Sequence, residues 1–161
     1  MIHNIDNDRQ FMQEALSLAR EAAADGEAPI GAVIVRGGET VGSGRNRREK
    51  NKNALCHAEI EAINSACENL GGWRLIGCTM YVTLEPCPMC AGAIINSRIE
   101  RVVFGAYDKK AGSCGSVVNL FDLPYNHKPE LTGGVMEAEC AAELSRFFKG
   151  LREKKLSGST E

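Results

Sequence analysis

Two short segments of the chain contain residue types that bind metals and transfer protons. The first is His57-Ala58-Glu59, and the second is Pro86-Cys87-Pro88-Met89-Cys90. One imidazole and two thiolates form a three-ligand tetrahedral zinc site in which a fourth position stays open for water. Glu59 follows the histidine closely enough to transfer protons of that water without binding the metal. The spacing therefore predicts a catalytic zinc centre that activates water.

Both segments are expected to lie where a strand or loop enters a helix. Apolar residues repeat at helical spacing after His57, and Pro88 suits the first helical position because its missing N–H costs nothing there. A helix N-terminus offers free N–H groups and the positive end of the helix dipole, which favour the thiolate that zinc requires. One helical turn then brings Cys87 and Cys90 to a single ion.

The predicted chemistry is hydrolytic. Zinc lowers the pKa of its bound water to about 7, so hydroxide is available to attack an amidine-like ring carbon. The ring nitrogen and the departing ammonia both need protons, and one carboxylate within hydrogen-bond reach can supply them. Glu59 is the candidate for this role, whereas Glu85 is expected to be structural.

Two other interpretations of the cysteines stay open. A lone C-x-x-C in an α/β protein can be a redox pair, although this gives no role to His57 or Glu59. A closed structural zinc site needs a fourth protein ligand. Cys56 is a candidate for it, although the side chains of neighbouring residues diverge.

The rest of the chain supplies alternating elements that must position these groups. Helices are expected over residues 8–25, 57–70, 88–95 and 137–154, and strands over 29–35, 39–46, 79–84, 101–105 and 131–135. This alternation predicts an α/β fold with helices on both faces of one sheet. Residues 1–156 are expected to form a single zinc-dependent domain, and the polar end, residues 157–161, to be disordered.

Composition narrows the class of protein. Of 161 residues, 43% are hydrophobic and 25% charged, as in globular proteins, and no apolar run is long enough to cross a membrane. The N-terminus has no secretory pattern and the cysteine count of seven is odd, so a cytoplasmic location is expected. Cys67, Cys78 and Cys140 are expected to pack as small hydrophobic residues.

Charge alone does not indicate a nucleic-acid partner. The net charge is −2, which argues against a generic, sequence-blind binder of nucleic acid. Two local groups of cations remain, residues 45–52 and the C-terminal set Arg146, Lys149, Arg152, Lys154 and Lys155. Each group is either solvated surface or a set of phosphate contacts.

The H-x-E and P-C-x-x-C motifs together resemble the signature of zinc nucleobase deaminases. The likeness extends to Gly26–Val33, Asn46, Trp73–Leu75, Tyr81–Ala93, Arg101–Ala106, Asp108, Gly115-Ser116, Asn126-His127 and Phe147-Phe148. Over about residues 8–155 the chain is similar to the bacterial tRNA-specific adenosine deaminases of the cytidine and deoxycytidylate deaminase superfamily.

This resemblance implies a cytidine-deaminase-like three-layer α/β/α sandwich with a five-stranded mixed sheet. It also implies a homodimer with one Zn²⁺ per subunit and an anticodon stem-loop of tRNA as the substrate. The reaction would be the deamination of adenosine to inosine at the wobble position (34), with zinc-bound hydroxide attacking C6. His57, Cys87 and Cys90 would bind the zinc, and Glu59 would be the proton shuttle.

The resemblance also implies substrate contacts. Asn46 would hydrogen-bond the flipped purine in a pocket lined by Pro29, Ile30, Ala58 and Leu84. The anticodon-loop nucleotides would lie near Asp108, Asn126 and His127. From residue type alone, Asn46 is equally a loop-capping residue and Asn126-His127 a surface turn. Two other functions compete: a free-base or nucleoside deaminase, such as a guanine or cytosine deaminase, and an RNA-binding subunit without catalysis.

Overall fold

The computed structural model describes residues 5–157 and contains every helix and strand that the sequence predicts. In chain order the elements are α1 (Ile5–Ala24), β1 (Gly31–Arg36), β2 (Glu39–Arg45), α2 (Ala58–Leu70), β3 (Thr79–Leu84), α3 (Pro88–Ser97), β4 (Arg101–Ala106), the 3₁₀ helix η1 (Leu120–Asp122), β5 (Glu130–Thr132) and α4 (Glu137–Leu156). The tail predicted to be disordered lies outside the described residues, except for Ser157 at the end of α4.

The five strands form one mixed sheet in the order β2-β1-β3-β4-β5. Strand β1 pairs antiparallel with β2 and β3, whereas β3 pairs parallel with β4, and β4 with β5. Helix α3 provides the crossover that the parallel β3–β4 pair requires. Because these two strands run in the same direction, their last residues, Leu84 and Ala106, are paired. The loops that follow them therefore leave the sheet at the same edge.

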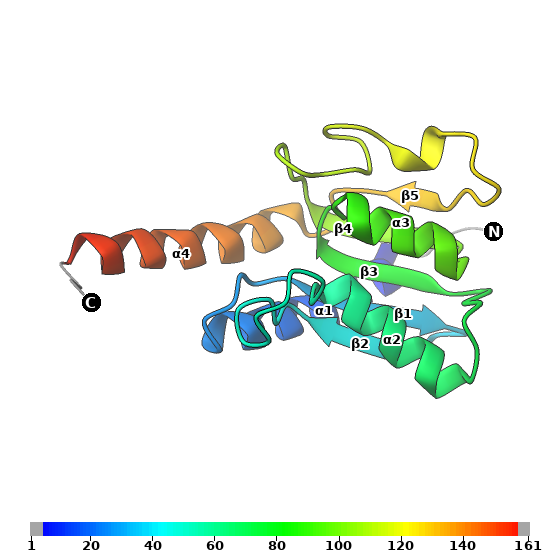
Figure 1. The fold of residues 1–161 in the computed structure, drawn as a ribbon, viewed down its shortest axis with the longest axis horizontal. Helices are drawn as coiled ribbons and strands as arrows, with labels where there is room; N and C mark the ends of the chain where they lie inside the picture. Colours follow the sequence, from blue (N-terminus) through cyan, green and yellow to red (C-terminus); the bar gives the residue numbers. More distant parts are fainter. Residues whose placement is uncertain (1–4, 158–161) are drawn as a thin grey trace.

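Helices cover both faces of the sheet (Figure 1). Successive residues of β1 alternate between two apolar clusters, with Ile34 in the cluster that contains α2 and α3 and Val33 in the cluster that contains α1. The start of α4 joins the α1 side through the buried Cys140. In Figure 1 the remainder of α4 extends away from the sheet. The predicted three-layer sandwich with a five-stranded mixed sheet is confirmed.

Two glycines of β2 allow α2 to lie very close to the sheet. A Cβ atom at Gly42 would lie 2.7 Å from the carbonyl oxygen of Ala62, and one at Gly44 would collide with the carbonyl oxygen of Ala58. In a close-packed interior, such side chains would displace the helix. The absence of side chains at these glycines therefore fixes the start of α2, which carries His57 and Glu59, against the sheet.

A few details differ from the expectations. Strand β5 ends at Thr132 instead of continuing to residue 135, because Gly134 and Met136 adopt left-handed backbone conformations that no strand accommodates. The η1 turn was not predicted, and its cap, Asn119, accepts a hydrogen bond from the N–H of Phe121. Helix α1 begins at Ile5 and not at residue 8.

Cysteine packing follows the prediction in part. Cys78 and Cys140 are buried, whereas Cys67 is half-buried, and all seven thiols are free. Within residues 5–157, none of the helices combines the length and the apolar character needed to cross a membrane.

Candidate active site

The predicted metal ligands meet at the N-termini of two helices. His57 is the N-cap of α2 and Cys87 is the N-cap of α3, both with extended backbone, and Pro88 begins the α3 helix. Nδ1 of His57 lies 3.6 Å from Sγ of Cys87 and 3.6 Å from Sγ of Cys90. All three ligand atoms lie within 4.8 Å of one another. Sheet pairing thus brings together two motifs that are distant in the sequence.

These separations fit a zinc ion. Zinc bonds of about 2.0–2.1 Å to nitrogen and about 2.3 Å to sulfur, at a tetrahedral angle, place the two atoms about 3.5 Å apart. The observed separations of 3.6 Å match this value. Among the described residues, no further His, Cys, Asp or Glu side chain joins the cluster. The donor set therefore leaves one tetrahedral position for water.

The alternative of a closed zinc site is not supported by the position of Cys56. Its sulfur accepts a long hydrogen bond from Nδ2 of Asn51, at 3.5 Å, and Cys56 is not a member of the metal-type cluster. The interpretation of Cys87 and Cys90 as a simple redox pair is also unsupported, since it leaves the close approach of His57 to both sulfurs without a function.

Hydrogen bonds share protons among the three ligand groups, and a bound cation would replace those protons. A hydrogen bond from the thiol of Cys90 lowers the pKa of Cys87 to about 4. The hydrogen bond between His57 and Cys87 raises the pKa of His57 above its usual value. The hydrogen bond between Cys90 and Cys87, together with burial, raises the pKa of Cys90. Because a divalent cation binds deprotonated ligands, it takes the place of these protons.

Glu59 lies in the first turn of α2 and is 4% exposed. Burial raises the pKa of its carboxyl group to about 7. A carboxyl group with such a pKa can both accept and release a proton near neutral pH, as a general acid–base must. Glu59 is not among the clustered ligand atoms, which agrees with a role in proton transfer and not in metal binding.

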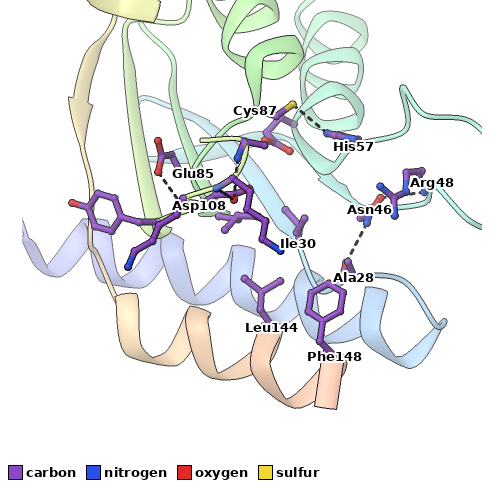
Figure 2. A pocket seen from close by; sticks show the side chains of 16 residues that line it. Ala28, Ile30, Asn46, Arg48, His57, Glu85, Cys87, Asp108, Leu144 and Phe148 are labelled. Carbon is purple, nitrogen blue, oxygen red and sulfur yellow. Dashed lines mark hydrogen bonds between the residues drawn. The ribbon is translucent and has the colours of Figure 1, made fainter. Parts of the chain in front are cut away.

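A cavity of about 560 Å³ opens in front of these groups. It is lined by Ala28, Ile30, Asn46, Arg48, His57, Glu59, Leu84, Glu85, Cys87, Tyr107, Asp108, Lys109, Lys110, Ala111, Leu144 and Phe148. Figure 2 shows His57 and Cys87 on one side of this space, and Leu144 and Phe148 rising from α4 on the other. The cavity is therefore bounded on one side by His57, Glu59 and Cys87 and on another by α4. The loop before α2, with Arg48, and the loop after β4, with residues 108–111, form its two loop walls.

Some predicted pocket residues line this cavity and others do not. Ile30, Leu84 and Asp108 are in its lining, whereas Pro29 and Ala58 are buried and do not line it. Ala28, which was not predicted, lines the cavity next to Pro29.

Asn46 both lines the cavity and holds the backbone. Its Nδ2 donates to the carbonyl oxygen of Ala28 at 3.3 Å, and its Oδ1 accepts from the N–H of Arg48 at 3.1 Å. The two interpretations of Asn46, a loop cap and a cavity residue, are therefore compatible. These two bonds fix the plane of the amide at the rim of the cavity.

Asn126 and His127 do not line the cavity. Nε2 of His127 donates to the carbonyl oxygen of Ile99, at 2.6 Å, just before β4 begins. The cavity residues Tyr107–Ala111 follow the end of the same strand. The six residues of β4, at about 3.3 Å each, therefore place His127 about 20 Å from the cavity residues at the other end of the strand.

Sequence reasoning missed the cations and the aromatic side chains of the cavity wall. Arg48 belongs to the basic segment 45–52, but its composition alone gave no direction toward the site. Lys109 and Lys110 follow β4, and Phe148 comes from the far C-terminal helix. These residues can be assigned to the site only from the tertiary structure, which shows which loops leave the same edge of the sheet.

Glu85 has a separate role beside the metal ligands. Its carboxylate is 2% exposed and accepts hydrogen bonds from the loop after β4. Burial raises the pKa of this group, but the hydrogen bonds from Ser116 and from backbone N–H groups outweigh burial and hold the pKa below its usual value. The carboxylate is thus charged and fully engaged with the loop.

Comparison with known proteins adds to this geometry. The family model described as the zinc-binding region of cytidine and deoxycytidylate deaminases matches residues 5–106, which include His57, Glu59, Cys87 and Cys90. The chain belongs to this deaminase family. The deaminase family uses zinc, and the cluster of one histidine and two cysteines in this deaminase is placed to bind a metal ion.

The relatives of this deaminase include tRNA-specific adenosine deaminases and a guanine deaminase. The chain is 50% identical over 149 residues to the tRNA-specific adenosine deaminase of Bacillus subtilis, covering 92% of each chain. A solved structure from a study of A-to-I editing by tRNA:A34 deaminases matches with a TM-score of 0.81 and 45% identity, over 84% of this chain and 99% of that chain. A guanine deaminase from Bacillus subtilis matches with a TM-score of 0.62 and 32% identity, over 91% and 94% of the two chains.

Proposed function

We propose that this deaminase converts adenosine to inosine at the wobble position of a tRNA anticodon. The observation that carries the proposal is one cavity lined by His57, Cys87 and Glu59 and also by three cations, Arg48, Lys109 and Lys110. Cations around a site suit a polyanionic substrate, because phosphate contacts release bound counterions. The 50% identical tRNA-specific adenosine deaminase and the 45% identical structure from the work on tRNA:A34 deaminases support the same reaction.

His57, Cys87 and Cys90 would hold the zinc ion. When bound, zinc makes hydroxide available at neutral pH by lowering the pKa of water to about 7. Glu59 would take one proton of that water and deliver it to the ring nitrogen, and would then take the remaining hydroxyl proton and deliver it to the amino group of adenine. The water oxygen becomes the carbonyl oxygen of inosine, and the amino group leaves as ammonia, so atoms and charge balance.

The walls of the cavity orient the base. An asparagine side chain has two N–H donors and one oxygen with two lone pairs. Asn46 donates one N–H to the carbonyl oxygen of Ala28, and one lone pair of its oxygen accepts the N–H of Arg48. The other N–H and lone pair would bind the flipped purine, whose faces contact the side chains of Ile30 and Leu84. Such a fixed amide selects a base by its hydrogen-bonding edge.

The remaining expectations from the sequence are part of the same proposal. Asp108, at the edge of the cavity, contacts the nucleotides next to the reacting base, and Asn126 and His127 contact nucleotides farther along the RNA. The protein acts as a homodimer with RNA bound near the subunit interface, and its tRNA substrate implies a cytoplasmic location. Light scattering after size-exclusion chromatography tests the dimer.

The test is inosine formation in an anticodon stem-loop with adenosine at the wobble position, using the zinc-loaded protein. Free adenosine, guanine, cytosine and cytidine are assayed in parallel for release of ammonia. We expect inosine in the stem-loop and no turnover of the small substrates. Turnover of guanine alone would assign the chain to the guanine deaminase group, and no turnover of any substrate would favour a binding subunit.

A further inference from the structure

Both loop walls of the cavity are held by buried carboxylates that belong to neither the metal cluster nor the proposed proton shuttle. Glu27, which is 1% exposed, accepts hydrogen bonds from the loop before α2. Glu85, which is 2% exposed, accepts hydrogen bonds from the loop after β4. A buried carboxylate is costly unless its oxygens are hydrogen-bonded, so each loop conformation is linked to the charge beneath it.

Glu85 has the more extensive set of bonds. Its Oε1 accepts from the N–H of Asp108 at 3.0 Å and the hydroxyl of Ser116 at 2.5 Å. Its Oε2 accepts from the N–H of Cys114 at 3.1 Å and the N–H of Ser116 at 3.0 Å. Gly112 packs so closely over the carboxylate that a Cβ atom there would collide with it. The loop from Asp108 to Ser116 is therefore wrapped around this one side chain.

The loop held by Glu85 forms a wall of the cavity. Asp108, Lys109, Lys110 and Ala111 line the cavity, and Oδ1 of Asp108 accepts from the N–H of Lys110 at 3.0 Å. Glu85 itself lies in the chain between Leu84, which lines the cavity, and the zinc ligand Cys87. Figure 2 shows the hydrogen bond that Glu85 accepts from the backbone of Asp108. One residue thus links the zinc segment to a cationic wall.

Glu27 holds the opposite wall, which is formed by the loop before α2. Its two oxygens accept from the N–H of Glu49, at 2.9 Å, and the N–H of Lys50, at 2.7 Å. Arg48, directly before them, lines the cavity. The far side of this loop is fixed to α2 by the ion pair of Arg47 with Glu61, at 3.0 Å. The position of Arg48 therefore depends on the carboxylate of Glu27.

We propose that Glu27 and Glu85 are positioning residues that hold the two cationic walls in register with the zinc centre and so set the affinity for RNA around the reacting base. The inference rests on the proposed function for its substrate. Neither residue needs to touch the base or the water. The carboxylates act through the backbone of the loops, so their loss should affect substrate binding more than the chemical step.

Replacement by glutamine distinguishes the two residues. Glutamine keeps the shape of glutamate but turns one acceptor oxygen into an N–H₂ donor. Glu85→Gln leaves two donors of the loop facing that N–H₂ group, whereas Glu27→Gln leaves one. Ser116→Ala removes the hydroxyl bond alone and keeps the three backbone bonds. Loop opening should therefore increase in the order wild type, Ser116→Ala, Glu85→Gln.

The experiment measures hydrogen exchange of backbone amides, zinc content and steady-state kinetics on the anticodon stem-loop for the zinc-loaded variants. In Glu85→Gln we expect exchange at residues 108–116, and KM, to rise by at least about tenfold, since each lost hydrogen bond weakens loop closure by roughly tenfold. Exchange elsewhere and zinc content should not change, and kcat should change by less than about threefold. In Glu27→Gln the faster exchange is expected at residues 48–50 instead.

Glu100→Gln is the matched control, because Glu100 is exposed at the opposite end of β4 and its replacement removes the same charge. Unchanged exchange in the loops, or a fall in kcat at constant KM, would overturn the proposal. A uniform rise in exchange would show that these residues only stabilise the fold. If Glu85→Gln does not fold, Ser116→Ala still tests the loop.

Failure of the wild type to form inosine would reject the proposed function. Hydrogen exchange of the loop amides alone would then decide whether the carboxylates hold the walls.

Discussion

Nδ1 of His57 lies 3.6 Å from Sγ of Cys90, although the two residues stand at the starts of different helices and are 33 positions apart. Two features of the sheet produce this approach. Close packing of α2 on Gly42 and Gly44 fixes the histidine, and the β3–α3 junction fixes the cysteine. The metal-type cluster is therefore a product of tertiary packing, and a bound metal should in turn hold α2 and α3 together.

Replacing Cys90 by serine should abolish zinc binding while the sheet remains folded. Two ligand atoms hold zinc far less tightly than three, so zinc content should fall by at least about tenfold and turnover with it. Cys67→Ser is the control, since Cys67 is a half-buried thiol outside the cluster. Metal analysis after dialysis, together with circular dichroism, checks this. Full zinc content in Cys90→Ser would contradict the assignment of the ligands.

Glu59→Gln should separate metal binding from chemistry. The amide cannot accept the proton of water, so turnover should fall by about 10²–10⁴-fold, the usual contribution of general acid–base catalysis. Zinc content and the affinity for a stem-loop should stay close to those of the wild type. The control is Glu68→Gln, an exposed glutamate of the same helix. Persistent turnover in Glu59→Gln would assign proton transfer to another group.

The close approach of His57, Cys87 and Cys90 could be predicted from the sequence because they lie in two short motifs at helix starts. Pro88 and the C-x-x-C spacing define one helical turn, and the apolar repeat after His57 defines the other. Local pattern was therefore sufficient to predict that His57, Cys87 and Cys90 come together, whereas their binding of zinc and the role of Glu59 stay predictions. Local pattern was also sufficient for the order of helices and strands, which the structure confirms.

The walls of the cavity could not be predicted in the same way. Lys110 and Phe148 come from loops and helices whose meeting depends on the strand order and on the direction in which α4 leaves the sheet. Glu27 was equally hidden, because nothing in the local sequence distinguishes it from a surface glutamate, whereas Glu85 was expected to be structural and its hydrogen bonds agree with that expectation. The end of β5 was predicted too far along the chain, since the left-handed conformation of Met136 has no signal in a methionine.

Salt should weaken the reaction on RNA, and each cavity cation should contribute to that dependence. For single-stranded RNA, each phosphate contact adds about 0.7 to the slope of log affinity against log salt concentration. Lys110→Ala should therefore lower the slope of log(kcat/KM) by about 0.7, and Arg48→Ala by a similar amount. Arg36→Ala, at the opposite end of the sheet, should leave it unchanged. A slope that does not depend on Lys110 would exclude its contact with phosphate.

A buried ion pair far from the cavity should support the fold without affecting catalysis. The guanidinium of Arg101 donates two hydrogen bonds of 2.8 Å to the carboxylate of Asp8, and the hydroxyl of Tyr81 donates a third, of 2.9 Å. Asp8 is 5% exposed and Arg101 is 6% exposed. Breaking such a pair leaves an uncompensated buried charge, so Asp8→Asn should cost about 3–5 kcal/mol of unfolding free energy.

The exposed pair of Lys128 with Asp122, at 3.5 Å, is the control for this prediction. Asp122→Asn should cost less than about 1 kcal/mol, because exposed ion pairs are weak. Urea unfolding measures both costs. The rate per folded molecule should be the same in Asp8→Asn as in the wild type, since Arg101 begins β4 and the cavity follows its other end. A lower rate at full folding would mean that the contact of α1 with β4 is transmitted along the strand to the site.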